Sequence, residues 1–170
     1  MRRTARKISE LPPRNEIPGI CKRTRKNLSW FISQHKNGAD VHVGTQLTLS
    51  LLGFVVFPDS DPKLKEHLMS KSLDALRREG WPELTLLMDC PKEKKDATSS
   101  LCELVHHLRD AVSHHHIRYS SDSRDLEQID ITFEDYYPKK DTPYWRAEIS
   151  AKGLLAFCYK FAELVDEYYG

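Results

Sequence analysis

The stretch LCELVHHLRDAVSHHHI, residues 101–117, carries the strongest pattern in this 170-residue sequence. Its apolar residues recur at three- and four-residue spacing, which forms one continuous stripe along an α-helix. The members of this stripe are Leu101, Leu104, Val105, Leu108, Ala111 and Val112. Polar and titratable residues lie off the stripe, among them Arg109, Asp110, Ser113 and His114. The pattern predicts a helix over about residues 98–115 that packs the core with one face and presents an arginine and a histidine with the other.

The other apolar patterns predict a mainly α-helical fold, an antiparallel bundle with a small β-hairpin between the last two helices. Helical spacing predicts four further helices, at about residues 21–34, 40–57, 62–78 and 150–168. A change to a two-residue period predicts the hairpin at about residues 126–149. Residues 83–88 are predicted to form a short helical or 3₁₀ piece. The helix-capping residues predicted are Asp61, Ser150 and either Thr98 or Ser99.

Composition divides the chain into a basic N-terminal segment, residues 1–19, and one domain, residues 20–170. The segment is rich in proline and has no helical or strand period, so we expect it to be flexible. The formal net charge of the whole chain is +1, but basic residues crowd its N-terminal end. Such a local patch can hold phosphates, or it can serve only to solubilise the chain. Arg25 is the candidate substrate-binding residue from this region.

The sequence gives no sign of a membrane segment or of a disulfide framework. No apolar run approaches the roughly 18 residues that a membrane helix needs. The four cysteines have no CxxC spacing, which leaves a zinc ribbon and a disulfide scaffold unsupported. We therefore expect reduced cysteines and a cytoplasmic protein.

Arg109 and His114 are separated by four residues, and the residue after Arg109 is the polar Asp110. An apolar helix carrying this arrangement resembles the signature of the HEPN superfamily. Over about residues 22–170, the predicted order of elements also resembles a plasmid- and defence-associated bacterial HEPN subfamily. That order is a first helix, an apolar second helix ending in FVVFP, the signature helix, a strand pair and a closing helix.

The resemblance implies a metal-independent endoribonuclease that acts as a homodimer and needs no cofactor. Its partners would be RNA, a second copy bound through helix 101–117, and a cognate antitoxin or defence partner. Similar proteins cut single-stranded RNA with the ribose 2′-hydroxyl as nucleophile, in toxin-like or anti-phage settings. The alternative is a non-catalytic HEPN protein that binds a nucleotide, RNA or a toxin–antitoxin partner, and a further alternative is an interaction scaffold.

The residue chemistry agrees with cleavage of a phosphodiester. Histidine titrates near neutral pH, so His114 can take or deliver a proton. The permanently charged guanidinium of Arg109 can stabilise phosphoryl oxygens. Asp110 and Ser113 are expected to support these two residues. In proteins that this chain resembles, many carry Asn at the position of Asp110, although Asp also occurs. The carboxylate of Asp110 can orient a histidine or repel phosphate.

Helical geometry raises a question about this pair. Five residues correspond to about 140° of rotation in an ideal helix, so Arg109 and His114 do not share a face. His107, Asp110 and His114 do share one. Either the helix distorts or ends near His114, or the productive arginine and histidine come from different protomers.

Three further candidate substrate-binding residues complete the predicted site. Gln46 and Ser50 form a polar pair that can line a site or hydrogen-bond locally, and His115 follows the catalytic candidate. No two histidines of helix 98–115 have i, i+4 spacing, so no metal site is predicted there. The motif residues also have a purely structural interpretation, because Arg109 can pair with a surface carboxylate and the helix dipole favours protonated histidines at a helix C-terminus.

Aromatic residues of the hairpin can stack RNA bases or cover the bundle: Tyr136, Tyr137, Tyr144 and Trp145.

Overall fold

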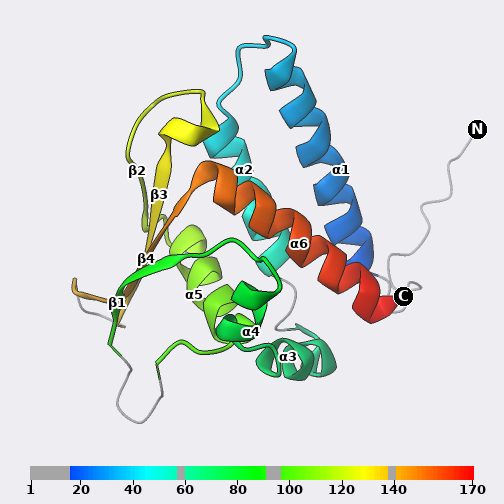
Figure 1. Ribbon diagram of the computed structural model, residues 1–170, viewed down its shortest axis with the longest axis vertical. Coiled ribbons are helices and arrows are strands. Elements are labelled where there is room, and N and C mark those ends of the chain that lie inside the picture. Colours follow the sequence, from blue (N-terminus) through cyan, green and yellow to red (C-terminus); the bar gives the residue numbers. More distant parts are fainter. Residues whose placement is uncertain (1–15, 57–59, 91–96, 138–140) are drawn as a thin grey trace, which may run out of the picture.

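The computed structural model describes residues 16–56, 60–90, 97–137 and 141–170. These residues are mostly helical and also form a small antiparallel sheet (Figure 1). The helices are α1 (Glu16–Lys36), α2 (Val43–Val55), α3 (Pro62–Met69), α4 (Leu73–Arg78), α5 (Leu101–Ser113) and α6 (Ala151–Tyr169). The strands are β1 (Thr85–Asp89), β2 (Ile117–Tyr119), β3 (Asp130–Tyr136) and β4 (Pro143–Ser150).

The four strands follow the spatial order β1-β4-β3-β2, and every neighbouring pair is antiparallel. The central pair, β3 and β4, corresponds to the two strands of the predicted hairpin. The predicted hairpin appendage is nevertheless incomplete, because β1 and β2 extend it on either side. Figure 1 shows the helices together on one side of this sheet.

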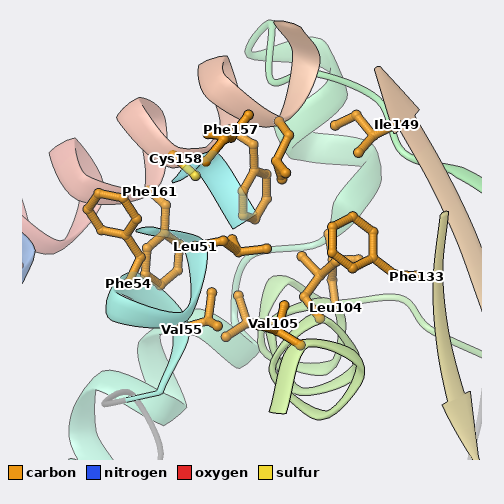
Figure 2. Packing of buried hydrophobic residues seen from close by; sticks show 14 of the residues in the cluster. Leu51, Phe54, Val55, Leu104, Val105, Phe133, Ile149, Phe157, Cys158 and Phe161 are labelled. Carbon is orange, nitrogen blue, oxygen red and sulfur yellow. The ribbon is translucent and has the colours of Figure 1, made fainter. Parts of the chain in front are cut away.

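The core lies where α2, α5 and α6 meet the inner face of the sheet. Figure 2 shows buried side chains from the three helices and from strands β3 and β4 converging there: Leu51, Phe54, Val55, Leu104, Val105, Phe133, Ile149, Phe157, Cys158 and Phe161. The α1 helix packs against α2 and α6. Gly53 permits close contact of α1 with α2, because a Cβ atom there would lie 2.9 Å from Oγ1 of Thr24.

Two predicted helical segments differ in the structure. The predicted helix 62–78 is two helices, since the Ser72 hydroxyl caps a new helix by accepting the backbone N–H of Ala75 at 3.2 Å. Residues 83–88 contain strand β1 instead of a helical piece. The reason is pairing: β1 adds to the edge of β4, with Thr85 opposite Glu148.

Predicted helix boundaries were partly correct. Asp61 and Ser150 cap α3 and α6, as predicted. Thr98 and Ser99 do not cap α5, because Ser100 does so through a capping box with Glu103. The α1 helix begins at Glu16, so residues 16–19 are helical and not part of a flexible segment. The rest of that predicted segment, residues 1–15, lies outside the described residues.

Candidate active site

The α5 helix buries the predicted apolar stripe and ends where the candidate motif ends. All six residues of the stripe are buried. The last helical residue is Ser113, and His114 is the C-cap. His115 adopts a left-handed conformation, with φ of 60°, at a position that glycine usually occupies. The N–H of His116 donates to the carbonyl of Ala111 at 2.8 Å and so closes the helix end. One of the two geometric expectations, that the helix ends near His114, is therefore correct.

Arg109 makes a compact cluster with two neighbours on its own helix. Its Nε and Nη2 atoms both donate to Oδ1 of Asp110, at 2.9 and 2.8 Å. Nη2 also lies 3.0 Å from Nδ1 of His106, and Nε2 of His106 lies 3.4 Å from Oδ2 of Asp110. Because a guanidinium can only donate, Nδ1 of His106 accepts and its Nε2 carries the proton that faces Asp110. The Arg109 side chain is 22% exposed, so the cluster lies at the surface.

His107, which follows His106 in α5, points to the sheet and not to the Arg109 cluster. Its Nδ1 atom lies 2.9 Å from Oδ2 of Asp135 on β3, and its ring stacks on Trp145 with centroids 4.7 Å apart. The hydroxyl of Tyr144 donates to the same Asp135 oxygen. Burial and this hydrogen bond to Asp135 raise the pKa of Tyr144 far above its usual value, so Tyr144 stays a neutral donor.

Sequence reasoning did not identify Asp135 as part of a site. The two-residue period of β3 could have revealed it, because Asp135 shares the inward face of the strand with Ile131 and Phe133. An acidic residue at a core position requires hydrogen-bond donors.

A second buried carboxylate lies on the other face of the sheet. Glu134 accepts hydrogen bonds from Nε of Arg146 at 2.7 Å, from Arg118 at 3.1 Å and from the Tyr136 hydroxyl at 2.9 Å. Burial alone would raise the pKa of Glu134, but the donors outweigh it and hold this pKa below its usual value. The ring of His116 packs on Tyr136, with centroids 4.2 Å apart.

The remaining predicted site residues fall into two groups. Ser113, His114 and His115 are exposed together at the C-terminal end of α5. The other three make contacts within the helical bundle. Gln46 donates to the buried Ser50 at 3.3 Å within α2, and Arg25 pairs with Asp166 of α6 at 3.2 Å. These contacts favour structural roles for Arg25, Gln46 and Ser50.

The described part of the chain has neither a metal-binding cluster nor a membrane-spanning helix. No group of three or more metal-ligating side chains occurs there. The four cysteines are free thiols, and burial together with the nearby Asp166 raises the pKa of Cys21 to about 11. Within the same residues, no helix is long and apolar enough to cross a membrane. A surface cavity of about 610 Å³ has Lys22, Asp61 and Tyr168 among its lining residues and includes none of the catalytic candidates.

The chain matches a known protein family over nearly its whole length. The family model described as HEPN pEK499 p136 matches residues 10–170. No curated protein and no solved structure matches the chain. The family match covers nearly the whole sequence, including α5 and the entire sheet. HEPN domains are in general associated with ribonuclease activity or nucleotide binding. The chain therefore belongs to the HEPN pEK499 p136 family, a plasmid-associated branch of the HEPN superfamily.

Proposed function

We propose that this protein is a metal-independent endoribonuclease that cleaves single-stranded RNA at a site shared by two copies of the chain. The observation that carries the proposal is the position of the family motif. Arg109 lies on the surface of α5, and His114 is exposed directly beyond the last turn. An RNA strand lying across this end of α5 would meet both residues. The biological setting that fits this activity is a toxin-like or anti-phage role in the cytoplasm, with a cognate antitoxin or defence partner.

The proposed roles follow from charge and proton transfer. Arg109 stabilises the negative charge that develops on the phosphoryl oxygens, because its guanidinium stays charged and donates in a fixed fork. His114 transfers a proton to or from a reacting oxygen. Asp110 holds the guanidinium through two hydrogen bonds and so orients it, while Ser113 supplies a nearby hydroxyl.

The geometry of α5 favours a site that is completed by a second copy. Ideal helical spacing puts Arg109 and His114 about 140° apart. His114 is the C-cap and its N–H still bonds to the Asp110 carbonyl, so its backbone continues the last turn and the two side chains leave α5 in different directions. A two-fold axis beside α5 would bring the arginine of one copy near the histidine of the other. Such a homodimer interface would run along the outer face of the Leu101–Ser113 helix.

The first experiment measures cleavage of mixed RNA and tRNA in the presence of EDTA. We expect the wild type to cut, and we expect His114→Ala and Arg109→Ala to be slower by about 10²–10⁴-fold. His42→Ala is the control, because His42 is an exposed histidine before α2. Equal cleavage rates for the wild type and all three variants would contradict the proposal. Loss of wild-type activity in EDTA would indicate a metal-dependent reaction.

The second experiment tests the shared site by mixing two inactive variants. A dimer that combines Arg109→Ala with His114→Ala retains one intact arginine–histidine pair across the interface. With free subunit exchange, half of the dimers are mixed and each has one of two sites intact, so about a quarter of wild-type activity should return. No recovery in an exchanged mixture that is shown to contain mixed dimers would place both residues in one protomer.

A second candidate function is RNA or nucleotide binding without cleavage. The observation that favours it is the pairing of Arg109 with Asp110, because a carboxylate beside the guanidinium opposes the approach of phosphate. Undetectable turnover together with measurable binding to RNA would support this candidate. Asp110→Asn should then strengthen RNA binding, because it removes a negative charge while keeping a hydrogen-bond acceptor for Arg109.

A further inference from the structure

We propose that His107 is the general base of the cleavage reaction, held in place by Asp135 and Tyr144, and that His114 is the general acid. This inference rests on the proposed ribonuclease function and deepens it. The motif supplies one histidine per chain, whereas 2′-hydroxyl attack needs one proton removed and another delivered. The structure contains a second histidine on α5, His107, whose surroundings suit removal of the 2′-hydroxyl proton.

The ring of His107 is fixed on two sides. Nδ1 bonds to Oδ2 of Asp135 at 2.9 Å, and the ring plane lies on Trp145 at an interplanar angle of 15°. With Asp135 ionised, Nδ1 is the protonated nitrogen and Nε2 keeps its lone pair. Tyr144 donates to the same carboxylate oxygen, so the position of Asp135 is fixed as well. A carboxylate that orients the imidazole through Nδ1 is the arrangement that leaves Nε2 ready to accept a proton.

The Nε2 atom of His107 remains open. None of the hydrogen bonds from the described residues reaches it, and it is not among their buried unpaired atoms. The side chain is 14% exposed, which is enough for one ring edge to meet solvent. The neighbouring His106 differs from His107 in this respect, because both of its ring nitrogens have partners, Arg109 and Asp110. His106 therefore positions the arginine, while His107 retains a free acceptor.

Among the described residues, the groups around His107 come from α5, from β3 and β4, and from the residue that follows β3. The strands contribute Asp135 and Tyr144, and Tyr137, directly after β3, has its ring 4.7 Å from that of Tyr144. The helix contributes His106, with its ring centroid 6.0 Å from that of His107, and then Arg109 and Asp110. His106 lies between the proposed base and the arginine, because it contacts Nη2 of Arg109 and its ring neighbours that of His107.

The proposed step balances without an external reagent. Nε2 of His107 takes the proton of the ribose 2′-hydroxyl, and the 2′-oxygen forms a bond to phosphorus. The bond between phosphorus and the 5′-oxygen breaks, and protonated His114 delivers a proton to that oxygen. The products are a 2′,3′-cyclic phosphate and a 5′-hydroxyl, and no atom is oxidised or reduced.

The orientation of the two side chains favours histidines from different copies. His107 is directed toward the sheet, where its Nδ1 bonds to Asp135. His114 is exposed beyond the last turn of α5, seven positions and about 10 Å further along the axis. The shared site proposed above would bring the His114 of the second copy to the phosphate that meets His107.

The test uses an RNA whose scissile 5′-oxygen is replaced by sulfur. A thiolate leaves without protonation, so this substrate does not need a general acid. We expect His114→Ala to lose about 10²–10⁴-fold on ordinary RNA and to regain most of its rate on the sulfur substrate. We expect His107→Asn to lose a similar factor on both substrates, because the base is still required.

The substitution His107→Asn keeps the hydrogen bond to Asp135, since the Asn amide can replace Nδ1, and removes Nε2. Thermal melting and circular dichroism establish whether the variant folds. Tyr144→Phe, which leaves both imidazoles in place, is the second variant, and a rate loss on both substrates is expected for it too. The control is the cleavage rate of His42→Asn, which makes the same substitution at a histidine outside α5.

The outcomes separate this inference from the proposed function. A wild type that cuts neither substrate would overturn the ribonuclease proposal itself. A folded His107→Asn that cuts ordinary RNA at the wild-type rate, beside an impaired His114→Ala, would overturn the assignment of His107 alone. Recovery of His107→Asn on the sulfur substrate would make His107 the acid and would also overturn it.

Discussion

Glu134 and Asp135 are consecutive residues of β3, and both of their carboxylates are buried, at 2% and 6% exposure. Their side chains point to opposite faces of the sheet, because alternate strand residues do so. Asp135 faces α5 and bonds to the His107 ring and the Tyr144 hydroxyl. Glu134 faces away from the helices and bonds to two arginines and the Tyr136 hydroxyl.

The partners of these two acids determine what each can do. Arginine stays charged at every pH that the protein meets, so Glu134 is held ionised and ties β2, β3 and β4 together. An imidazole has two ring nitrogens, so His107 can bond to Asp135 through Nδ1 and accept a proton at Nε2. Two neighbouring carboxylates of similar burial thus differ in their expected effects on stability and on activity.

Arg146→Met should have the largest effect on stability. It leaves the buried Glu134 without its closest cation, and removal of one partner from a buried ion pair destabilises a protein by about 3 kcal/mol or more. Urea denaturation measures the loss in the free energy of unfolding. Arg77→Met, at an exposed arginine with surface ion pairs, is the matched control with an expected change of about 0.5 kcal/mol or less. Equal effects of the two substitutions would contradict the structural role of Glu134.

Tyr144→Phe should have the next largest effect. It removes a neutral donor from the buried Asp135, and a hydrogen bond to a charged group contributes about 2 kcal/mol. Tyr119→Phe, which removes a bond between two neutral hydroxyls, is the control with an expected loss of about 1 kcal/mol. A smaller loss for Tyr144→Phe than for this control would show that Asp135 does not depend on the phenol.

Acid should weaken the fold partly through Glu134. Because the folded pKa of Glu134 lies below its ordinary value of 4.5, its contribution to stability is present above that pH and is lost as the pH falls through the folded pKa. Glu103 at the α5 cap has a lowered pKa and acts in the same direction. We therefore expect Glu134→Gln to reduce, without abolishing, the drop in unfolding free energy between pH 5 and pH 3, about the range in which carboxylates titrate. An unchanged drop would remove Glu134 as a source of acid sensitivity.

Arg118→Met should have the smallest effect. The Arg118 side chain is 70% exposed, so its bond to Glu134 is screened by water and contributes about 0.5 kcal/mol or less. Denaturation at low and at high salt measures the difference, which should shrink as salt is added. A loss as large as that of Arg146→Met would mean that the two arginines are equivalent, contrary to their different burial.

The fold was predictable where its determinants are local. The apolar stripe of α5 and the caps Asp61 and Ser150 act within one or two helical turns, and the structure agrees with each. The segment that forms strand β1 was predicted to contain a short helical or 3₁₀ piece, and its sequence TLLMD carries no two-residue alternation that would indicate a strand. It becomes a strand by pairing with β4, which lies far along the chain. The break before α4 was also missed, because it depends on one serine hydroxyl.

The candidate site was predictable to a similar extent. The family motif singled out Arg109 and His114, and the family itself is confirmed. His107 had been assigned to the same helical face as Asp110, but its partner on β3 could not be named from α5 alone. Asp135 becomes visible as a partner only when the strand alternation is combined with the packing of α5 on the sheet.

By itself the sequence determined which face of α5 is buried and to which family the chain belongs. The helical period repeats every 3.6 residues and is a property of neighbouring residues, so it can be read locally. Only the tertiary structure decided that Asp135 meets His107 while Glu134 meets Arg146. Those contacts depend on the register of β3 against β4 and on the docking of α5, and a register shift of one residue would exchange the two faces.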